Sequence, residues 1–257
     1  MNTLSVVLIT HNAAKTLAAT LESVRWADEI IVLDSGSNDD TLAIAQTFGA
    51  QCYQQTDWQG FGRQRQIAQS YASSDYVLML DSDEQVTSEL YRSIQGILQQ
   101  PVQRNIAYAC ARRNRFIGRY MKHCGWYPDY VIRLYLREER QYNNDRVHES
   151  LNMEQAHLHY LDGDLLHETA PNFIEFQQKQ LRYAEQWALQ RKQQGKQGSL
   201  WQAFSHSLSA FLKTYLIRKG FLDGKHGIVL SLIVTQYTFN KYVALWALTQ
   251  KKRMRHR

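Results

Sequence analysis

Cysteine is scarce in this chain, which argues against two kinds of cross-linked scaffold. Its 257 residues contain only Cys52, Cys110 and Cys124, an odd number without the close spacing of metal-binding pairs. We therefore expect neither a disulfide framework nor a cysteine-based metal site, and a reducing compartment is the default. The N-terminus also lacks the basic region and cleavage site of a signal peptide, so residues 4–9 are expected to form a first strand. These absences favour a cytoplasmic protein.

Acidic residues are almost missing from the C-terminal part. Residues 199–257 hold ten Lys or Arg and one acid, Asp223, hence a net charge of +9, and since the whole chain carries +6, residues 1–198 carry −3. Such asymmetry indicates a polyanionic partner, either nucleic acid or an anionic membrane leaflet. A nucleic-acid binder would spread basic and aromatic residues across the main domain. We therefore expect a membrane surface and no nucleic acid.

Glycine is missing from the turn after the first strand, where Thr10, His11 and Asn12 stand. A dinucleotide-binding oxidoreductase needs a glycine fingerprint there, and a sugar-phosphate nucleotidyltransferase usually needs a glycine-rich phosphate loop. The first is disfavoured, and the second is kept as an alternative. What the chain does have is an alternation of apolar runs (residues 4–9, 29–33 and 76–80) with helix-forming segments (13–24, 41–48 and 62–71). That alternation predicts an α/β fold with a mostly parallel, Rossmann-like sheet flanked by helices.

Three polar clusters follow the predicted strands, at residues 10–12, 34–37 and 81–84. Ligands of parallel sheets bind beyond the carboxyl ends of the strands, so these clusters are expected to meet in one crevice. On an extended backbone Asp81 and Asp83 would point the same way, and two such carboxylates suit Mg²⁺ or Mn²⁺. Taken alone, the Asp-x-Asp pair would more often be a solvated turn. Asp34 could equally bind a base or ribose, or close an Asx turn.

Three segments carry a family resemblance: Ser-Val-Val-Leu-Ile-Thr-His-Asn, Ile-Ile-Val-Leu-Asp-Ser-Gly-Ser-Asn-Asp-Asp-Thr and Tyr-Val-Leu-Met-Leu-Asp-Ser-Asp-Glu. In this order they resemble the nucleotide-sugar half of family 2 glycosyltransferases, which have the GT-A fold. The resemblance continues through residues 133–135, 146–149 and 215–227. Its nearest form looks like the enzymes that add β-glucose to heptose in the inner core of bacterial lipopolysaccharide.

The resemblance implies roles for the strand-end acids. Asp34 would hold the uridine or ribose of a UDP-hexose, Asp81 the ribose or a metal-bound water, and Asp83 a metal on the diphosphate. A histidine near the place of His167 reaches the metal or diphosphate in related enzymes, although a lone histidine is more often structural. The predicted nucleotide-sugar residues are Thr10, Asn12, Asp34, Arg65 and Asp81, and the predicted ligands of Mg²⁺ or Mn²⁺ are Asp83, Asp81 and His167.

The acceptor side is expected in residues 101–170. A family 2 enzyme inverts the anomeric centre, so a carboxylate must deprotonate the acceptor hydroxyl. Glu149 is the predicted base and Asp129 the second candidate, although Glu149 could instead pair with an arginine. The predicted acceptor-binding residues are Trp126, Tyr127, Arg113 and Arg133; the aromatic pair before Pro128 could equally pack onto a core.

The expected domains are a GT-A catalytic domain over 1–198, with a nucleotide-sugar half (1–100) and an acceptor half (101–198), and a basic helical appendage over 199–257. Residues 228–248 approach spanning length, but polar residues interrupt them, so we expect helices in the plane of an anionic leaflet, or packed on the domain or a second subunit. The predicted protein is an inverting, metal-dependent glycosyltransferase, peripheral on the inner face of the cell membrane. It would move glucose from UDP-glucose to a lipid-linked saccharide, the heptose of lipopolysaccharide inner core. A non-catalytic membrane-binding module on the same fold is a further alternative.

Overall fold

The computed structural model describes residues 1–143 and 150–253, with side chains described as far as residue 250. The chain divides into two compact units. Unit 1 consists of Met1–Arg112 and Asp129–Glu168, and unit 2 of Arg113–Pro128 and Thr169–Arg257. This division lies earlier in the chain than the boundary at 198/199 that the sequence suggested, because helix α5 clusters with the C-terminal helices.

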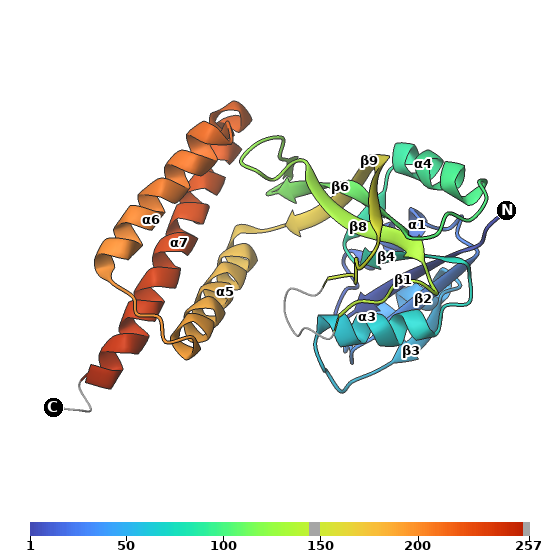
Figure 1. Cartoon of the computed structure of the whole chain (residues 1–257), viewed down its shortest axis with the longest axis horizontal. Coiled ribbons are helices and arrows are strands. Elements are labelled where there is room, and N and C mark those ends of the chain that lie inside the picture. The colour runs from blue at the N-terminus through green and yellow to red at the C-terminus, as the bar shows by residue number, and fades with distance from the viewer. Residues whose placement is uncertain (144–149, 254–257) are drawn as a thin grey trace. The chain divides into compact units, whose positions relative to one another are not determined.

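The first half of unit 1 is a parallel sheet with the strand order β3-β2-β1-β4. Strands β1, β2 and β4 are mainly apolar and buried almost throughout, as expected for parallel strands covered on both faces, whereas β3 is the more exposed segment Gln-Cys-Tyr-Gln. The helices supply the crossovers (Figure 1). The bounds are β1 Leu4–Thr10, α1 Leu17–Glu22, β2 Glu29–Asp34, α2 Thr41–Thr47, β3 Gln51–Gln54, α3 Phe61–Ser70 and β4 Tyr76–Asp81.

The second half of the sheet contains antiparallel pairs and continues from β4 in the order β8-β6-β9-β5. β5 turns back directly after the acidic segment that follows β4, and Thr87 caps helix α4 by accepting a hydrogen bond from Leu90 N. Side chains alternate between the two faces: Val6 and Leu8 join one core cluster, and Val7 joins the other. The bounds are β5 Glu84–Val86, α4 Ser88–Leu98, β6 Ile106–Phe116, β8 Asp129–Leu136 and β9 His157–Ala170.

The α/β fold predicted from the sequence is confirmed, and its differences are local. β4 ends at Asp81, so strand alternation does not set the direction of Asp83. In the sequence, Ser37 and Asp40 have the spacing of a capping box, which predicts a helix start here, but the Asp40 side chain makes no capping hydrogen bond to α2. Ser37 bonds Asp34 instead, and Asp39 accepts the hydrogen bond from Thr41 N.

Unit 2 is mainly helical. Helix α7 packs against both α5 and α6, which lie beside it in Figure 1. A small core contains Phe116, Phe176, Leu230 and Ile233. The elements are β7 Arg119–Tyr120, α5 Phe173–Gln193, α6 Leu200–Leu212, a π-helical turn Lys213–Ile217, a 3₁₀ turn Gly220–Asp223 and α7 Gly224–Arg253.

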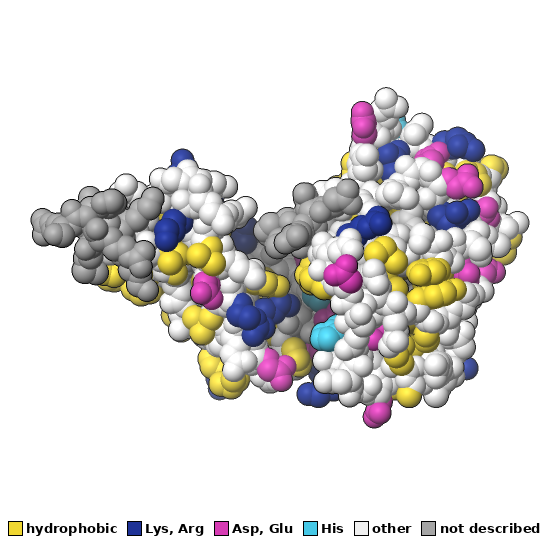
Figure 2. Space-filling model, turned by 90° about the horizontal axis from the view of Figure 1, so that it is seen from below, with side chains coloured by type: hydrophobic (Ala, Val, Ile, Leu, Met, Phe, Trp, Pro, Cys, Tyr) yellow, Lys and Arg dark blue, Asp and Glu magenta, His cyan; other side chains and the backbone are white. Residues whose placement is uncertain are grey.

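The chain approaches itself closely where α7 begins. A Cβ on Gly227 would lie 1.8 Å from the carbonyl oxygen of Gly220, so only glycine fits. Within the described residues, one helical stretch, Gly220–Gln250, is long and apolar enough to cross a membrane by length and composition. On the face shown in Figure 2, acidic and basic side chains are interspersed among apolar ones.

Candidate functional site

The carboxyl ends of β1, β2 and β4 lie side by side in unit 1, as the parallel pairing requires. Thr10 is in register with Asp34, and Ile9 with Asp81. The Thr10 hydroxyl donates a hydrogen bond to Asp34 Oδ1 over 3.1 Å. Side chains from three separate segments of the sequence therefore meet at one edge of the sheet.

Asp34 is fully buried and holds the turn that follows β2. Its Oδ2 accepts hydrogen bonds from Gly36 N at 3.0 Å and Ser37 N at 2.8 Å. These contacts are those of an Asx turn, one of the two interpretations that the sequence allowed. Asn12, with a left-handed φ of 52°, ties the neighbouring loop to the same turn: its backbone N donates to Ser37 Oγ at 2.8 Å. Their roles in nucleotide binding stay predictions.

A cavity of about 530 Å³ opens at these strand ends. Trp58 and Phe61 form one wall, with ring centroids 4.8 Å apart in an edge-to-face arrangement, and both are about half exposed. The hydroxyl of Ser35, another lining residue, is buried and has no hydrogen-bond partner among the residues that the structure describes. The remaining lining residues are Ile9, Thr10, His11, Asp81 and Ser82.

Trp58 and Phe61 did not emerge from the sequence as candidate site residues. A usable signal was present, because two large aromatic residues flank Gly60 immediately before a helix, in a segment that is otherwise polar. Gly60 has a φ of 105°, which lets the chain turn sharply between the two rings.

Asp81 lies between two arginines that hold it ionised. Its Oδ1 is 2.5 Å from Arg65 Nη2, and its Oδ2 is 2.6 Å from Arg133 Nη2. Burial opposes the charged form, but Arg133 and Arg65 outweigh it and hold the pKa of Asp81 well below its usual range. The structure therefore places Arg65 beside Asp81, while its predicted role in nucleotide-sugar binding stays a prediction.

The pairing continues as a chain of alternating charges. Arg133 Nη2 also lies 2.6 Å from Oε1 of Glu84, which is fully buried. Arg112 lies 3.6 Å from the same oxygen and binds Asp129 Oδ2 through Nε at 3.0 Å and Nη2 at 2.7 Å. Arg133, which the sequence assigned to the acceptor, is thus buried in the ion pairs beneath the acidic segment.

Asp83 faces His167. Its Oδ2 lies 3.4 Å from His167 Nε2, because β5 and β9 pair with Glu84 opposite His167. Both side chains are partly exposed, and carboxylate oxygen and imidazole nitrogen are ligands that Mn²⁺ accepts. Among the described residues there is no cluster of three or more His, Cys, Asp or Glu, so a cation here would take further ligands from phosphate and water. The pair fits that coordination, whereas both oxygens of Asp81 already face arginines.

The predicted acceptor residues of unit 2 lie close together. Trp126 packs edge-to-face on Phe116 and Phe176, with centroids 5.7 Å and 5.9 Å away, so its ring belongs partly to the core. The guanidinium of Arg113 lies over the ring of Tyr127, 5.7 Å from its centroid. Their contact with an acceptor stays a prediction.

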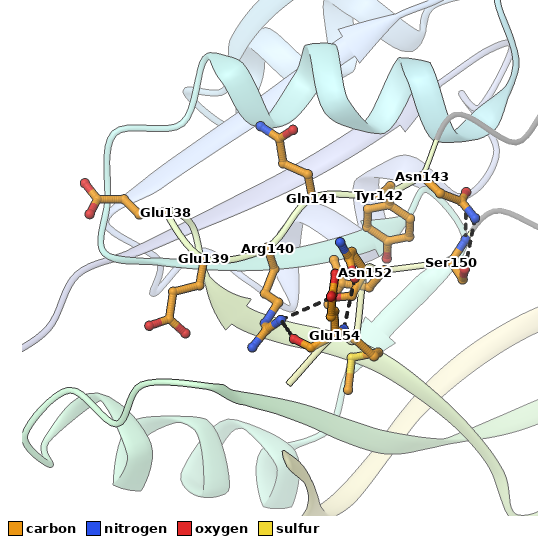
Figure 3. Close-up of a pocket in the computed structure, with 11 residues that line it drawn as sticks. Glu138, Glu139, Arg140, Gln141, Tyr142, Asn143, Ser150, Asn152 and Glu154 are labelled. Carbon is orange, nitrogen blue, oxygen red and sulfur yellow. Dashed lines mark hydrogen bonds between the residues drawn. The ribbon is translucent and has the colours of Figure 1, made fainter. Parts of the chain in front are cut away.

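The predicted base Glu149, with Arg146 and His148, lies outside the described residues. On either side of them, Asn143 N donates to Ser150 O at 2.9 Å. A second cavity, of about 800 Å³, is lined by residues 138–143 and 150–154. Figure 3 shows Arg140 in it, whose Nη1 donates to the carbonyl oxygens of Asn152 and Glu154. The other candidate base, Asp129, is held by Arg112.

Comparison with known proteins assigns the family. Residues 5–168 match the family model of Glycosyl transferase family 2. The chain belongs to this family. The chain is similar to an uncharacterized glycosyltransferase of Rickettsia typhi, 28% identical over 98% of this chain and 90% of that protein. The lipopolysaccharide core biosynthesis glycosyltransferase LpsC of Rhizobium meliloti is 25% identical over 92% of this chain and 89% of its own length.

Two solved structures resemble parts of this family 2 chain. S. aureus TarS has a TM-score of 0.47 and 17% identity over 72% of this chain and 39% of its own. The glucosyl-3-phosphoglycerate synthase of Mycobacterium tuberculosis, in complex with Mn²⁺, UDP and phosphoglyceric acid, has a TM-score of 0.36 and 27% identity over 44% of each chain. The chain spans less than half the length of either. Both TM-scores are low, and nothing further about this chain follows from them.

Proposed function

We propose that this family 2 glycosyltransferase moves glucose from UDP-glucose, with inversion, to a lipid-linked saccharide, the heptose of a lipopolysaccharide inner core. The observation that carries the proposal is the arrangement at the end of β4. Asp81 and Ser82 line a cavity with an aromatic wall, and Asp83 follows directly and faces His167. A cavity of about 530 Å³ is within the usual size range of small-ligand sites.

In this proposal the nucleotide enters the cavity with its base against Trp58 and Phe61. Aromatic rings stack on any base, and the buried Ser35 hydroxyl has hydrogen-bonding capacity left for a ligand. The diphosphate then lies toward Asp83 and His167, which would hold Mg²⁺ or Mn²⁺. That cation would stabilise the negative charge that develops on the departing diphosphate.

Asp81 has a positioning role in the proposal. Held by Arg65 and Arg133, it stays ionised and fixed in direction. Because Asp81 is the last residue of β4, its fixed position also fixes where the next turn begins. That turn determines where Asp83 lies. The arginines leave no net positive charge there, because Asp81 and Glu84 neutralise them.

Glu149 is the proposed base, which takes the proton of the acceptor hydroxyl as it attacks from the side opposite the diphosphate. Asp129 is the less favoured candidate, since Arg112 already donates two hydrogen bonds to its Oδ2. Trp126, Tyr127 and Arg113 remain the proposed acceptor contacts. The choice of a lipopolysaccharide acceptor is supported by the motif resemblance and by the similarity to LpsC at 25% identity.

The test uses two measurements. A panel of UDP-, GDP- and TDP-hexoses is scored by thermal protection with and without Mn²⁺, since a bound ligand raises stability according to its occupancy. UDP-glucose should raise the unfolding temperature more than the other nucleotide sugars do, and the full increase should require Mn²⁺. Transfer of radiolabelled glucose is then measured to lipopolysaccharide truncated at heptose. If only another nucleotide sugar protects the protein, UDP-glucose is not the donor. If UDP-glucose protects it but no glucose is transferred, the heptose of lipopolysaccharide is not the acceptor.

A further inference from the structure

Helix α6 of unit 2 presents a row of large apolar side chains to solvent. The exposed fractions of Trp201, Phe204, Leu208 and Ile217 are 80%, 61%, 61% and 76%. With neighbouring residues of the same helix and the turn after it, they line an open groove of about 650 Å³. Soluble monomers rarely expose a contiguous apolar patch of this kind without a binding partner.

The row is a consequence of helical spacing. Leu200, Phe204, Leu208 and Leu212 recur every four residues and share one face. The other side of the helix carries Ala203 and Ser207, which are buried where α6 packs against α7. Phe204 lies at the border of the two sides, with its ring centroid 5.4 Å from that of Phe239 on α7, whereas Trp201 and Leu208 are more than half exposed.

The exposed charged residues that follow this row in the sequence are all basic. Residues 200–212 contain no Asp, Glu, Lys or Arg, and Lys213, Arg218 and Lys219 follow, all exposed. Lys213 lines the groove itself. Asp223, the single acid of this region, is buried and accepts a hydrogen bond from His123 N at 2.8 Å. An apolar face beside cations matches a leaflet of anionic lipids, in which acyl chains lie beneath negative headgroups.

Helix α7 has the length and composition of a membrane span, but its surroundings do not suit one. It packs along α5, which carries six charged residues. Polar contacts join the two helices: Gln177 Nε2 donates to Gln236 Oε1 at 3.1 Å, and Lys241 Nζ lies 5.0 Å from the ring centroid of Trp187. If α7 crossed a bilayer, α5 would enter the hydrocarbon with its charges or these contacts would break, and both are costly.

We propose that the exposed face of α6, with Lys213 and Lys219 at its end, binds an anionic lipid leaflet in the plane of the membrane, and that α7 does not cross it. The inference rests on the proposed function in one respect, since a lipid-linked acceptor lies in such a leaflet. It is tested on vesicles that contain neither donor nor acceptor. Its failure is therefore distinguishable from failure of the transfer reaction.

The test measures binding of the full-length protein to vesicles of phosphatidylcholine with and without phosphatidylglycerol. The variant Trp201→Gln/Leu208→Gln should bind the anionic vesicles at least about tenfold more weakly, because two large apolar side chains no longer enter the leaflet. The matched control is Ile174→Gln/Leu181→Gln, which removes two comparably exposed apolar residues from α5 and should bind as the wild type does. Thermal unfolding should be unchanged in both variants, since neither pair is buried.

Two further measurements separate the rival explanations. Lys213→Gln/Lys219→Gln should weaken binding about fivefold per lysine, and only to vesicles with phosphatidylglycerol. Alkaline carbonate should extract the wild-type protein from cell membranes. Resistance to extraction would overturn the proposal in favour of a spanning α7. Equal losses of vesicle binding in the α5 and α6 variants would also overturn the proposal. So would a wild-type protein that binds no vesicles but forms a dimer in light scattering, if Trp201→Gln/Leu208→Gln dissociates that dimer.

Discussion

The Asp83 carboxylate lies 3.4 Å from Nε2 of His167, although the two residues come from distant parts of the sequence. The antiparallel pairing of β5 with β9 brings them together, with Glu84 directly opposite His167. An acid that follows a strand and an imidazole thus lie together, directly after Asp81 and Ser82, which line the cavity of about 530 Å³.

Asp83→Ala should abolish metal-dependent protection by UDP-glucose, because the carboxylate that would bind the cation is gone. The measurement is the shift in unfolding temperature with UDP-glucose, with and without Mn²⁺, together with the rate of transfer. Asp162→Ala, which removes an exposed acid elsewhere on β9, is the control and should behave as the wild type. An Mn²⁺ response in Asp83→Ala equal to that of the wild type would remove this residue from the site.

Trp58→Ala should weaken the binding of UDP-glucose and of UMP by similar factors, since both carry the uracil. Loss of a base-stacking ring costs about 1–3 kcal/mol. Isothermal titration of both ligands provides the check. A defect confined to UDP-glucose would place Trp58 near the sugar or diphosphate instead of the base.

Glu149→Gln should bind UDP-glucose normally and transfer glucose about 10²- to 10⁴-fold more slowly, because only the proton acceptor is lost. Single-turnover rates and nucleotide affinity are measured side by side. Asp129→Asn serves as the comparison. If Asp129→Asn shows the slow turnover and Glu149→Gln does not, the role of base passes to Asp129.

Arg133→Ala should lower the free energy of unfolding by about 3–5 kcal/mol, because it leaves the fully buried Glu84 and the partly exposed Asp81 without their shared cation. Urea unfolding monitored by circular dichroism measures the loss. Arg104→Ala is the matched control: its partner Glu139 lies 3.6 Å away but the arginine is largely exposed, so the expected change is below about 1 kcal/mol. Similar losses in both variants would contradict the importance of burial.

Asp75 should make the free energy of unfolding depend on pH. Thr3 donates its backbone N–H and its hydroxyl to Asp75 Oδ2, each over 2.9 Å, and these bonds lower the pKa of Asp75. A lowered pKa stabilises the fold above the unfolded value of about 3.9, and the benefit disappears as the pH falls through the folded value. Asp75→Ala should therefore lose roughly 1 kcal/mol at neutral pH, a small figure because the group is mostly solvated. The urea midpoints of the variant and wild type should converge below about pH 3.9. A gap that stays constant with pH would show that the charge is not involved.

The sequence was sufficient for the parallel half of unit 1 because three of its strands, β1, β2 and β4, are mainly apolar runs that are followed by polar residues. The family resemblance, not the strand pattern, implied that His167 lies near Asp83. The sequence did place the two acids, Asp81 and Asp83, at this end of the sheet. It did not reveal the partners of Asp81, since Arg65 and Arg133 reach it from a helix and from an antiparallel strand. Only the three-dimensional register places them there.

The sequence did not predict the start of helix α2 or the aromatic wall of the cavity, because both depend on local contacts. Ser37 has the spacing of a capping residue, but Asp34 and Asn12 bind it instead, so helix α2 begins without that cap. Trp58 and Phe61 were overlooked because the aromatic wall of a cavity has no fixed spacing in sequence, and this one depends on the turn at Gly60.

The run of ion pairs from Arg65 through Asp81, Arg133, Glu84 and Arg112 to Asp129 contains three cations and three anions in strict alternation. Each interior member is shared by two neighbours, and loss of any one member leaves the row with one unbalanced charge. The row therefore restricts how this enzyme can change: a new side chain at one position is tolerated best when a neighbour changes with it. Two opposite charges lost together would leave the remaining row balanced, and engineering of this site should proceed in such pairs.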